Sequence, residues 1–181
     1  MRADAQKNYE HLLDVARVVV AEQGADASLR DIARQADVVV GTFYRHFPSR
    51  EALLEALLRT SFDELTAQAA ELEASSSPRD ALEVWLRDCV AFSRTYRGVT
   101  TMMMSAIEDT GSALHASCVT MRAAGTQLLT RAQAAGTARA HLDGTDLFAI
   151  ISALAWLGDQ PATAGRADHL LDVIATAIFA G

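Results

Sequence analysis

The stretch SLRDIARQADVVVGTFYRHFPSR, residues 28–50, predicts two short helices that meet at a tight turn. Ser28 and Asp31 have the spacing of a capping box, so the first helix is expected to begin directly after Ser28. The chain is expected to turn at Asp37, because aspartate tolerates a left-handed backbone better than most non-glycine residues. The second helix is expected over residues 40–47.

This second helix has one apolar and one polar face. Phe43 and Phe47 lie four residues apart, which places them on the same side of a helix. The opposite side carries a hydroxyl, a phenol, a guanidinium and an imidazole group, from Thr42, Tyr44, Arg45 and His46. Such groups donate hydrogen bonds to phosphates and to base edges. The pattern is typical of a surface that binds DNA.

The longer stretch SLRDIARQADVVVGTFYRHFPSREALL resembles the helix-turn-helix of the TetR family of transcriptional regulators. The resemblance continues upstream through LLDVARVVVAEQG and covers the first third of the chain. It implies that Thr42, Tyr44 and His46 contact the DNA backbone. It also implies that the base edges are faced by Val39, Val40 and Arg45.

Two further features of this stretch affect the predicted DNA contacts. Arg50 begins the next helix, where a cation opposes the helix dipole unless an anion such as a phosphate lies nearby. Val39 and Val40 stand where the family often has polar residues, and valines can contact only the methyl group of thymine. The predicted DNA-binding residues are Ser28, Arg30, Val39, Val40, Thr42, Tyr44, Arg45, His46 and Arg50.

The composition predicts an all-α protein. The 181 residues are 50% hydrophobic, with three prolines and long runs of Ala, Leu, Glu and Arg, and no segment alternates strongly enough for a strand. We expect about nine helices, with a three-helix DNA-binding domain over residues 1–48. Residues 49–181 are expected to form a helical domain for ligand binding and dimerisation, joined to the first by the helix that starts at Ser49.

The charge is unevenly distributed. The net charge is −7, but residues 28–50 hold four arginines against two aspartates. A local basic face on an acidic body gives a modest electrostatic attraction to DNA, which a dimer would double.

Several classes of protein are not favoured. Cys89 and Cys118 are too few for a disulfide framework and lack the C-x-x-C spacing of zinc sites. A metal site at His115 and Cys118 is less favoured than a core thiol beside a hydrogen-bonded imidazole. There is no N-terminal signal sequence, no apolar run long enough to span a membrane and no catalytic motif. We therefore expect a cytoplasmic protein that is not an enzyme and has no cofactor, metal or membrane partner.

Outside residues 28–50, the sequence pattern predicts helices over residues 9–22, 49–75, 78–96, 99–110, 112–135, 143–158 and 166–180. Methionines and aromatic residues on these helices could line an adaptable pocket or simply fill a core, and both interpretations remain open. The predicted ligand-binding residues are Trp85, Cys89, Phe92, Met103, Ile107, His115, Cys118, Met121 and Trp156.

The last two helices are too apolar to face one neighbour and water, which predicts a symmetric interface with a second copy of the chain. The predicted interface residues are Leu147, Ile150, Ile151, Leu154, Leu170, Leu171, Ile174 and Ile178.

The sequence thus predicts a homodimeric regulator, most simply a repressor of a palindromic operator that an unknown apolar or amphipathic small molecule releases. One alternative is a ligand-independent DNA-binding or interaction protein with a solid core. Another is a redox sensor that uses Cys89 or Cys118.

Overall fold

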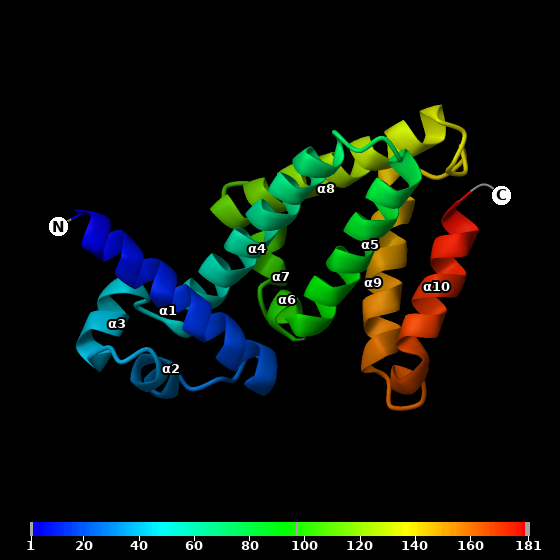
Figure 1. The fold of residues 1–181 in the computed structure, drawn as a ribbon. Coiled ribbons are helices and arrows are strands. Elements are labelled where there is room, and N and C mark those ends of the chain that lie inside the picture. Colours follow the sequence, from blue (N-terminus) through cyan, green and yellow to red (C-terminus); the bar gives the residue numbers. More distant parts are fainter. Residues whose placement is uncertain (1, 97, 180–181) are drawn as a thin grey trace. The chain divides into compact units, whose positions relative to one another are not determined.

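A computed structural model describes residues 2–96 and 98–179, and these residues are helical throughout apart from turns and one isolated bridge between Ala138 and Phe179 (Figure 1). The predicted all-α class is confirmed. The elements are α1 (Arg2–Gln23), α2 (Leu29–Gln35), α3 (Val40–His46), α4 (Arg50–Leu72), α5 (Pro78–Thr95), α6 (Val99–Met102), α7 (Met104–Glu108), α8 (Ala113–Ala134), α9 (Gly144–Asp159), the 3₁₀ helix η1 (Ala164–Arg166) and α10 (Ala167–Ile178).

The chain divides into two compact units. The first unit comprises the residues up to Thr60 together with Tyr96–His115. The second unit comprises Ser61–Thr95 and the residues from Ala116 onward. The start of α4 and the segment of α6 and α7 belong to the first unit. The division into functional domains at residue 48 stays a prediction.

In the first unit, α1 is longer than the sequence pattern predicted. The helix begins at Arg2, whereas the apolar stripe predicted a start at Tyr9. The additional turns are polar, and residues such as Ala, Gln and Lys favour a helix without needing a buried face. Gly24 follows the helix with a φ of 77°, as expected of a glycine that ends a helix.

The methionine segment does not form the single helix that was predicted over residues 99–110. It forms α6 and α7, which are separated at Met103, where the backbone has φ −92° and ψ 9°. Met103 is buried, whereas Met102 and Met104 are 43% and 45% exposed. No glycine or proline marks the break, so the sequence pattern could not reveal it.

In the second unit, α9 packs between α5 and α10. Ser77 caps α5, because its hydroxyl accepts from the Asp80 N–H at 3.3 Å. Asp143 and Asp146 form a complete capping box at the start of α9. The helix predicted over 166–180 begins one residue later at Ala167 and is described to Ile178; its predicted end at Ala180 lies outside the described residues.

Trp85 of α5 lies at the centre of this unit. Its side chain is fully buried, and its indole Nε1 donates to the Leu65 carbonyl at 2.9 Å. The ring meets Phe148 edge to face at 5.9 Å and lies so close to Gly125 of α8 that a Cβ there would overlap it. Gly125 therefore allows α8 to approach the tryptophan.

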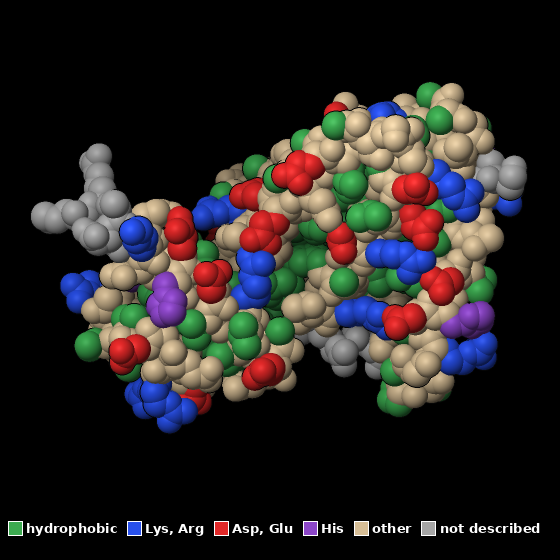
Figure 2. All heavy atoms as spheres, viewed as in Figure 1, with side chains coloured by type: hydrophobic (Ala, Val, Ile, Leu, Met, Phe, Trp, Pro, Cys, Tyr) green, Lys and Arg blue, Asp and Glu red, His purple; other side chains and the backbone are tan. Residues whose placement is uncertain are grey.

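Charged side chains alternate on the surface over α5 and α10 (Figure 2). Arg87 pairs with Asp172 at 2.8 Å, and Arg94 pairs with Asp168 at 3.0 Å. These exposed pairs join the two helices but add little stability each, because water screens them.

The residues of the predicted dimer interface differ in how exposed they are. Five of its eight residues are buried within the chain itself, so their burial needs no partner: Leu147, Ile151, Leu154, Leu171 and Ile178. Only Ile150, Leu170 and Ile174 remain partly exposed. Large apolar side chains elsewhere on these helices face solvent, with Trp156 60% and Val173 51% exposed.

Across the described residues, none of the helices combines the length and the apolar character that crossing a bilayer requires.

Candidate DNA-binding site

The two short helices meet as the sequence predicted. The Ser28 hydroxyl accepts from the Asp31 N–H at 3.3 Å and caps α2. After α2 the chain turns at Asp37, whose φ of 54° is left-handed. The Val38 N–H then donates to the Ala33 carbonyl at 3.0 Å, which closes the turn before α3 begins. The segment is a helix-turn-helix, with α3 in the position of the recognition helix.

Helix α1 packs against the helix-turn-helix. The His11 Nε2 lies 3.1 Å from the Ala36 carbonyl oxygen, at the end of α2. The Tyr9 ring packs on Phe47 at 5.2 Å and on His46 at 6.0 Å between centroids. Neither Tyr9 nor His11 was predicted as a site residue. Tyr9 was expected only as the start of the first helix, and His11 lies outside its apolar stripe. They set the position of the turn and of the His46 imidazole.

Arg50 has partners within the chain. Its Nη1 donates to the Ala25 carbonyl at 2.6 Å and to the Ala27 carbonyl at 2.8 Å. The guanidinium therefore ties the loop between α1 and α2 to the start of α4. The sequence predicted an anionic partner for this cation, whereas the structure gives its Nη1 two neutral carbonyl acceptors within the chain. Contact between Arg50 and a phosphate stays a prediction.

The two faces of α3 separate as predicted. Phe43 and Phe47 are 0% and 1% exposed, and their rings lie 5.5 Å apart. Tyr44 and Arg45 are exposed on the other side. The Arg45 Nη2 donates to the Thr42 hydroxyl at 2.9 Å, and Nε donates to the Gly41 carbonyl at 3.4 Å. Arg45 is thus held along the outer surface of α3, pointing toward its first turn.

The start of α3 is apolar and uncovered. Val39 is 78% exposed and Val40 is 39% exposed. Gly41 follows them, and a Cβ at this position would meet nothing within 4 Å. Its φ is not in the left-handed range, so nothing within the described residues requires glycine there. The other two predicted residues of this region, Ser28 and Arg30, are half-buried and exposed, respectively.

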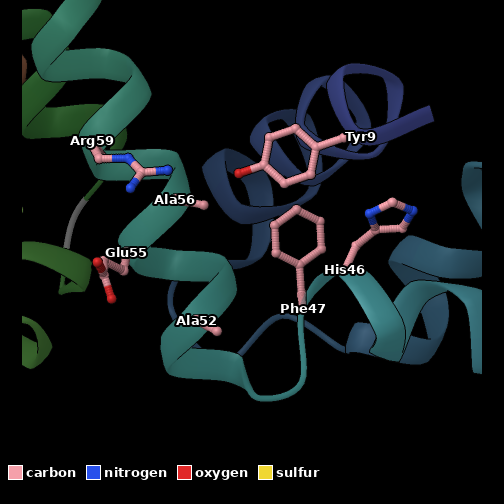
Figure 3. A pocket seen from close by; sticks show the side chains of 7 residues that line it. All are labelled: Tyr9, His46, Phe47, Ala52, Glu55, Ala56 and Arg59. Carbon is pink, nitrogen blue, oxygen red and sulfur yellow. The ribbon is translucent and has the colours of Figure 1, made fainter. Parts of the chain in front are cut away.

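A pocket of about 190 Å³ lies beside α3 in the first unit. Its lining side chains come from α1, the end of α3 and α4: Tyr9, His46, Phe47, Ala52, Glu55, Ala56 and Arg59 (Figure 3). The Tyr9 hydroxyl and the Arg59 guanidinium point toward one another across it, and Glu55 points away. None of the predicted ligand-binding residues lines this pocket.

The predicted ligand-binding residues are distributed over both units. In the second unit Trp85, Cys89 and Met121 are buried, while Phe92 and Cys118 are half-buried and Trp156 is exposed. In the first unit Met103 is buried, and His115 holds its Nδ1 at 2.8 Å from the Ile107 carbonyl oxygen. Ligand contact by these residues stays a prediction. Trp156 is a surface residue of the chain and does not belong to its core.

The environments of the two cysteines suppress thiolate formation. Burial raises the pKa of the Cys89 thiol far above its usual range, and the nearby Asp88 carboxylate adds to this shift. Burial also raises the pKa of Cys118, although Arg122 opposes the shift. Because the thiolate is the reactive form, burial disfavours reaction at both thiols, and the redox-sensor alternative stays a prediction. Within the described residues, no cluster of three or more His, Cys, Asp or Glu side chains could hold a metal ion.

The sequence matches two family descriptions. Residues 12–57 match the description "Bacterial regulatory proteins, tetR family". Residues 77–178, more than half of the chain, match "Transcriptional regulator SbtR-like, C-terminal domain". The first match includes the helix-turn-helix, and the second includes α5, α8, α9 and α10.

Individual relatives agree with these matches. The HTH-type transcriptional repressor KstR2 of Rhodococcus jostii is 40% identical over 65 residues, which are 35% of this chain and 32% of that protein. KstR2 of Mycobacterium tuberculosis is 35% identical over 74 residues, covering 40% of this chain and 37% of the relative. The chain therefore matches only about a third of the length of these curated relatives.

Solved structures are similar over the whole chain. The TetR transcriptional regulator SCO0520 of Streptomyces coelicolor is 32% identical, with a TM-score of 0.76, and the match covers 94% of this chain and 98% of that one. A TetR regulatory protein of Mycobacterium vanbaalenii is 29% identical with a TM-score of 0.75, covering 99% of both chains.

Proposed function

The chain belongs to the TetR family of bacterial transcriptional regulators and is not an enzyme, and we propose that it binds a palindromic operator as a homodimer and represses transcription until a small molecule releases it. The outward face of α3 carries this proposal. It presents a phenol, a guanidinium and an imidazole from a rigid helix-turn-helix, and such groups suit phosphates and base edges.

The roles on α3 follow from how each side chain is held. Tyr44 and Thr42 flank the exposed face, where they can donate to the DNA backbone. His46 is half-buried against Tyr9, so its imidazole is already oriented when DNA arrives. Arg45 lies along the outer surface. Its planar guanidinium can bind a guanine edge if its hydrogen bond to the Thr42 hydroxyl is replaced by hydrogen bonds to the base.

A dimer would use the uncovered apolar surface of α9 and α10. Trp156 and Val173 are exposed, with the partly exposed Ile150 and Ile174 on the same two helices. An exposed tryptophan is more typical of an interface than of a free surface. We therefore place the dimer contact on these side chains and no longer on the buried leucines.

The ligand is proposed to be small and apolar or amphipathic, bound in the C-terminal domain. In the second unit, the members of the predicted set that are not fully buried are Phe92, Cys118 and Trp156. Helix α4 is continuous from Arg50 to Leu72, with its first turns beside the helix-turn-helix. A ligand that favours one orientation of α4 would change the affinity for DNA by the difference in its own affinity for the two states.

A second candidate is a regulator whose DNA binding does not respond to a ligand. The observation that favours it is the tight packing around Trp85, which is fully buried and in contact with Gly125 and Phe148. A core filled in this way leaves no space at the tryptophan itself.

The first test is selection of bound fragments from random duplex DNA by the full chain at low ionic strength. We expect a palindrome whose half-sites are centred about one helical turn apart, and a mass of two chains in analytical ultracentrifugation. A chain that stays single at micromolar concentration, or that retains no duplex, would contradict the proposal.

The second test addresses the ligand. Compounds that raise the melting temperature of the chain are first identified from fractionated small-molecule extracts, and the operator affinity is then measured with each. Release by at least one compound supports the repressor mechanism. If every compound binds and none changes DNA affinity, the ligand-independent candidate is correct.

A further inference from the structure

The start of α3 stands out because it exposes apolar surface to water. Val39 is 78% exposed, the largest value among the exposed large apolar side chains described, and Val40 is 39% exposed. Both leave β-branched apolar groups in water, which is unfavourable in the free protein. Their exposure is explained if a partner covers them.

Gly41 strengthens this explanation. Glycine is less favourable than alanine in a helix, and here neither its φ nor a neighbouring atom requires it. A glycine of this kind is useful where another molecule must approach the backbone closely. The missing side chain would let the two valines before it come into contact with a surface.

The chemistry of that surface can be named. In a helix-turn-helix the first residues of the recognition helix face base edges in the major groove. The only apolar group that the bases present there is the 5-methyl group of thymine. Valine has no hydrogen-bonding side-chain atom, so it cannot distinguish the donor and acceptor patterns of the other bases.

We propose that Val39 and Val40 determine operator specificity by contacting thymine 5-methyl groups, so that each half-site carries one or two thymines which the protein recognises by their methyl group. This inference rests on the proposed DNA binding and adds the base class that this part of α3 selects. Arg45 donates hydrogen bonds to the Gly41 carbonyl and the Thr42 hydroxyl, and it would supply a polar base contact beside the thymine methyl groups.

Deoxyuridine provides the test, because it pairs like thymine and lacks only the methyl group. Each thymine of the selected operator is replaced in turn by deoxyuridine, and the affinity of the full chain is measured. Burial of one methyl group is worth about 0.8 kcal/mol, so we expect a loss of about fourfold at each contacted thymine and almost none at the others.

The variants Val39→Ala and Val40→Ala assign the contacts. Each should bind the natural operator about fourfold more weakly and lose the deoxyuridine penalty at the thymine that its valine contacts. The control is Val84→Ala, an exposed valine on α5, which should keep every penalty. Circular dichroism confirms that each variant is folded.

The outcomes separate the inference from the proposed function. If an operator is selected but deoxyuridine costs nothing, or if its cost is unchanged in both valine variants, the thymine inference is wrong and DNA binding stands. If no duplex is bound under any condition, the proposed function itself is wrong.

Discussion

The two units of this chain place similar side chains in opposite environments. In the first unit, α3 directs Tyr44 and Arg45 outward from a small core of Phe43 and Phe47. In the second unit, α5 directs Trp85 inward, where it is fully buried. The first arrangement leaves aromatic and cationic groups free to bind a partner, whereas the second uses an aromatic group for packing.

Two glycines make the contrast concrete. A Cβ at Gly41 of α3 would meet nothing, whereas a Cβ at Gly125 of α8 would overlap the Trp85 ring. At Gly125 the close group belongs to the same chain, whereas at Gly41 any close approach would have to come from another molecule. The difference shows that packing within the chain explains Gly125 but does not explain Gly41.

The largest effect is expected from Trp85→Ala. Loss of a fully buried tryptophan and of its hydrogen bond to Leu65 should lower the free energy of unfolding by about 3–5 kcal/mol. Denaturant unfolding measures the change, and Val84→Ala on the same helix is the control, expected to change it by less than about 0.5 kcal/mol. A mild effect of Trp85→Ala would mean that the ring lines an open pocket.

Arg50→Ala tests how much one side chain contributes to the stability of the first unit. Removing the two bonds to Ala25 and Ala27 should cost about 1.5–3 kcal/mol, because the donor is charged and its acceptors are left unpaired. Melting temperature without DNA is the readout. Arg34→Ala, which removes only an exposed pair with Asp31, should have almost no effect. Equal stability of both variants would favour a role for Arg50 in DNA contact alone.

Gly125→Ala should destabilise the chain by about 1–3 kcal/mol, since the added methyl group must displace Trp85 or separate α8 from it. The near-ultraviolet circular dichroism of the tryptophan should change as well. An increase in stability, which alanine normally gives inside a helix, would show that the close approach is not needed for folding.

Gly41→Ala should have the opposite effect on folding. We expect a gain of about 0.5–1 kcal/mol in the free energy of unfolding together with weaker binding to the operator. The combination is informative, because a variant that is more stable and binds less well cannot have lost DNA affinity through unfolding. Unchanged affinity would remove the argument that α3 approaches DNA closely at this glycine.

The local features that sequence reasoning predicted well are those encoded by one or two residues. Asp37 adopts the left-handed turn, and Ser28 caps its helix. These outcomes depend on the chemistry of a single side chain, which is visible in the sequence.

Features that depend on contacts between distant segments were not predictable. Periodicity shows that one side of α9 is covered, but it does not show that the chain itself already buries Leu147 and Ile151. The break at Met103 and the support of His46 by Tyr9 likewise arise from packing, and neither has a local signal. The same limit explains why Trp156, predicted in a pocket, lies on the surface.

The central claim is that the outer face of α3 reads DNA, and the most direct test compares selected operators for the wild type, Arg45→Ala and Tyr44→Phe. We predict that Arg45→Ala loses discrimination at one position per half-site, by about 1–3 kcal/mol, and keeps the rest of the motif. Tyr44→Phe should bind all sequences more weakly without changing the motif. Equal loss of discrimination in both variants, or motifs identical to the wild type at unchanged affinity, would contradict the claim.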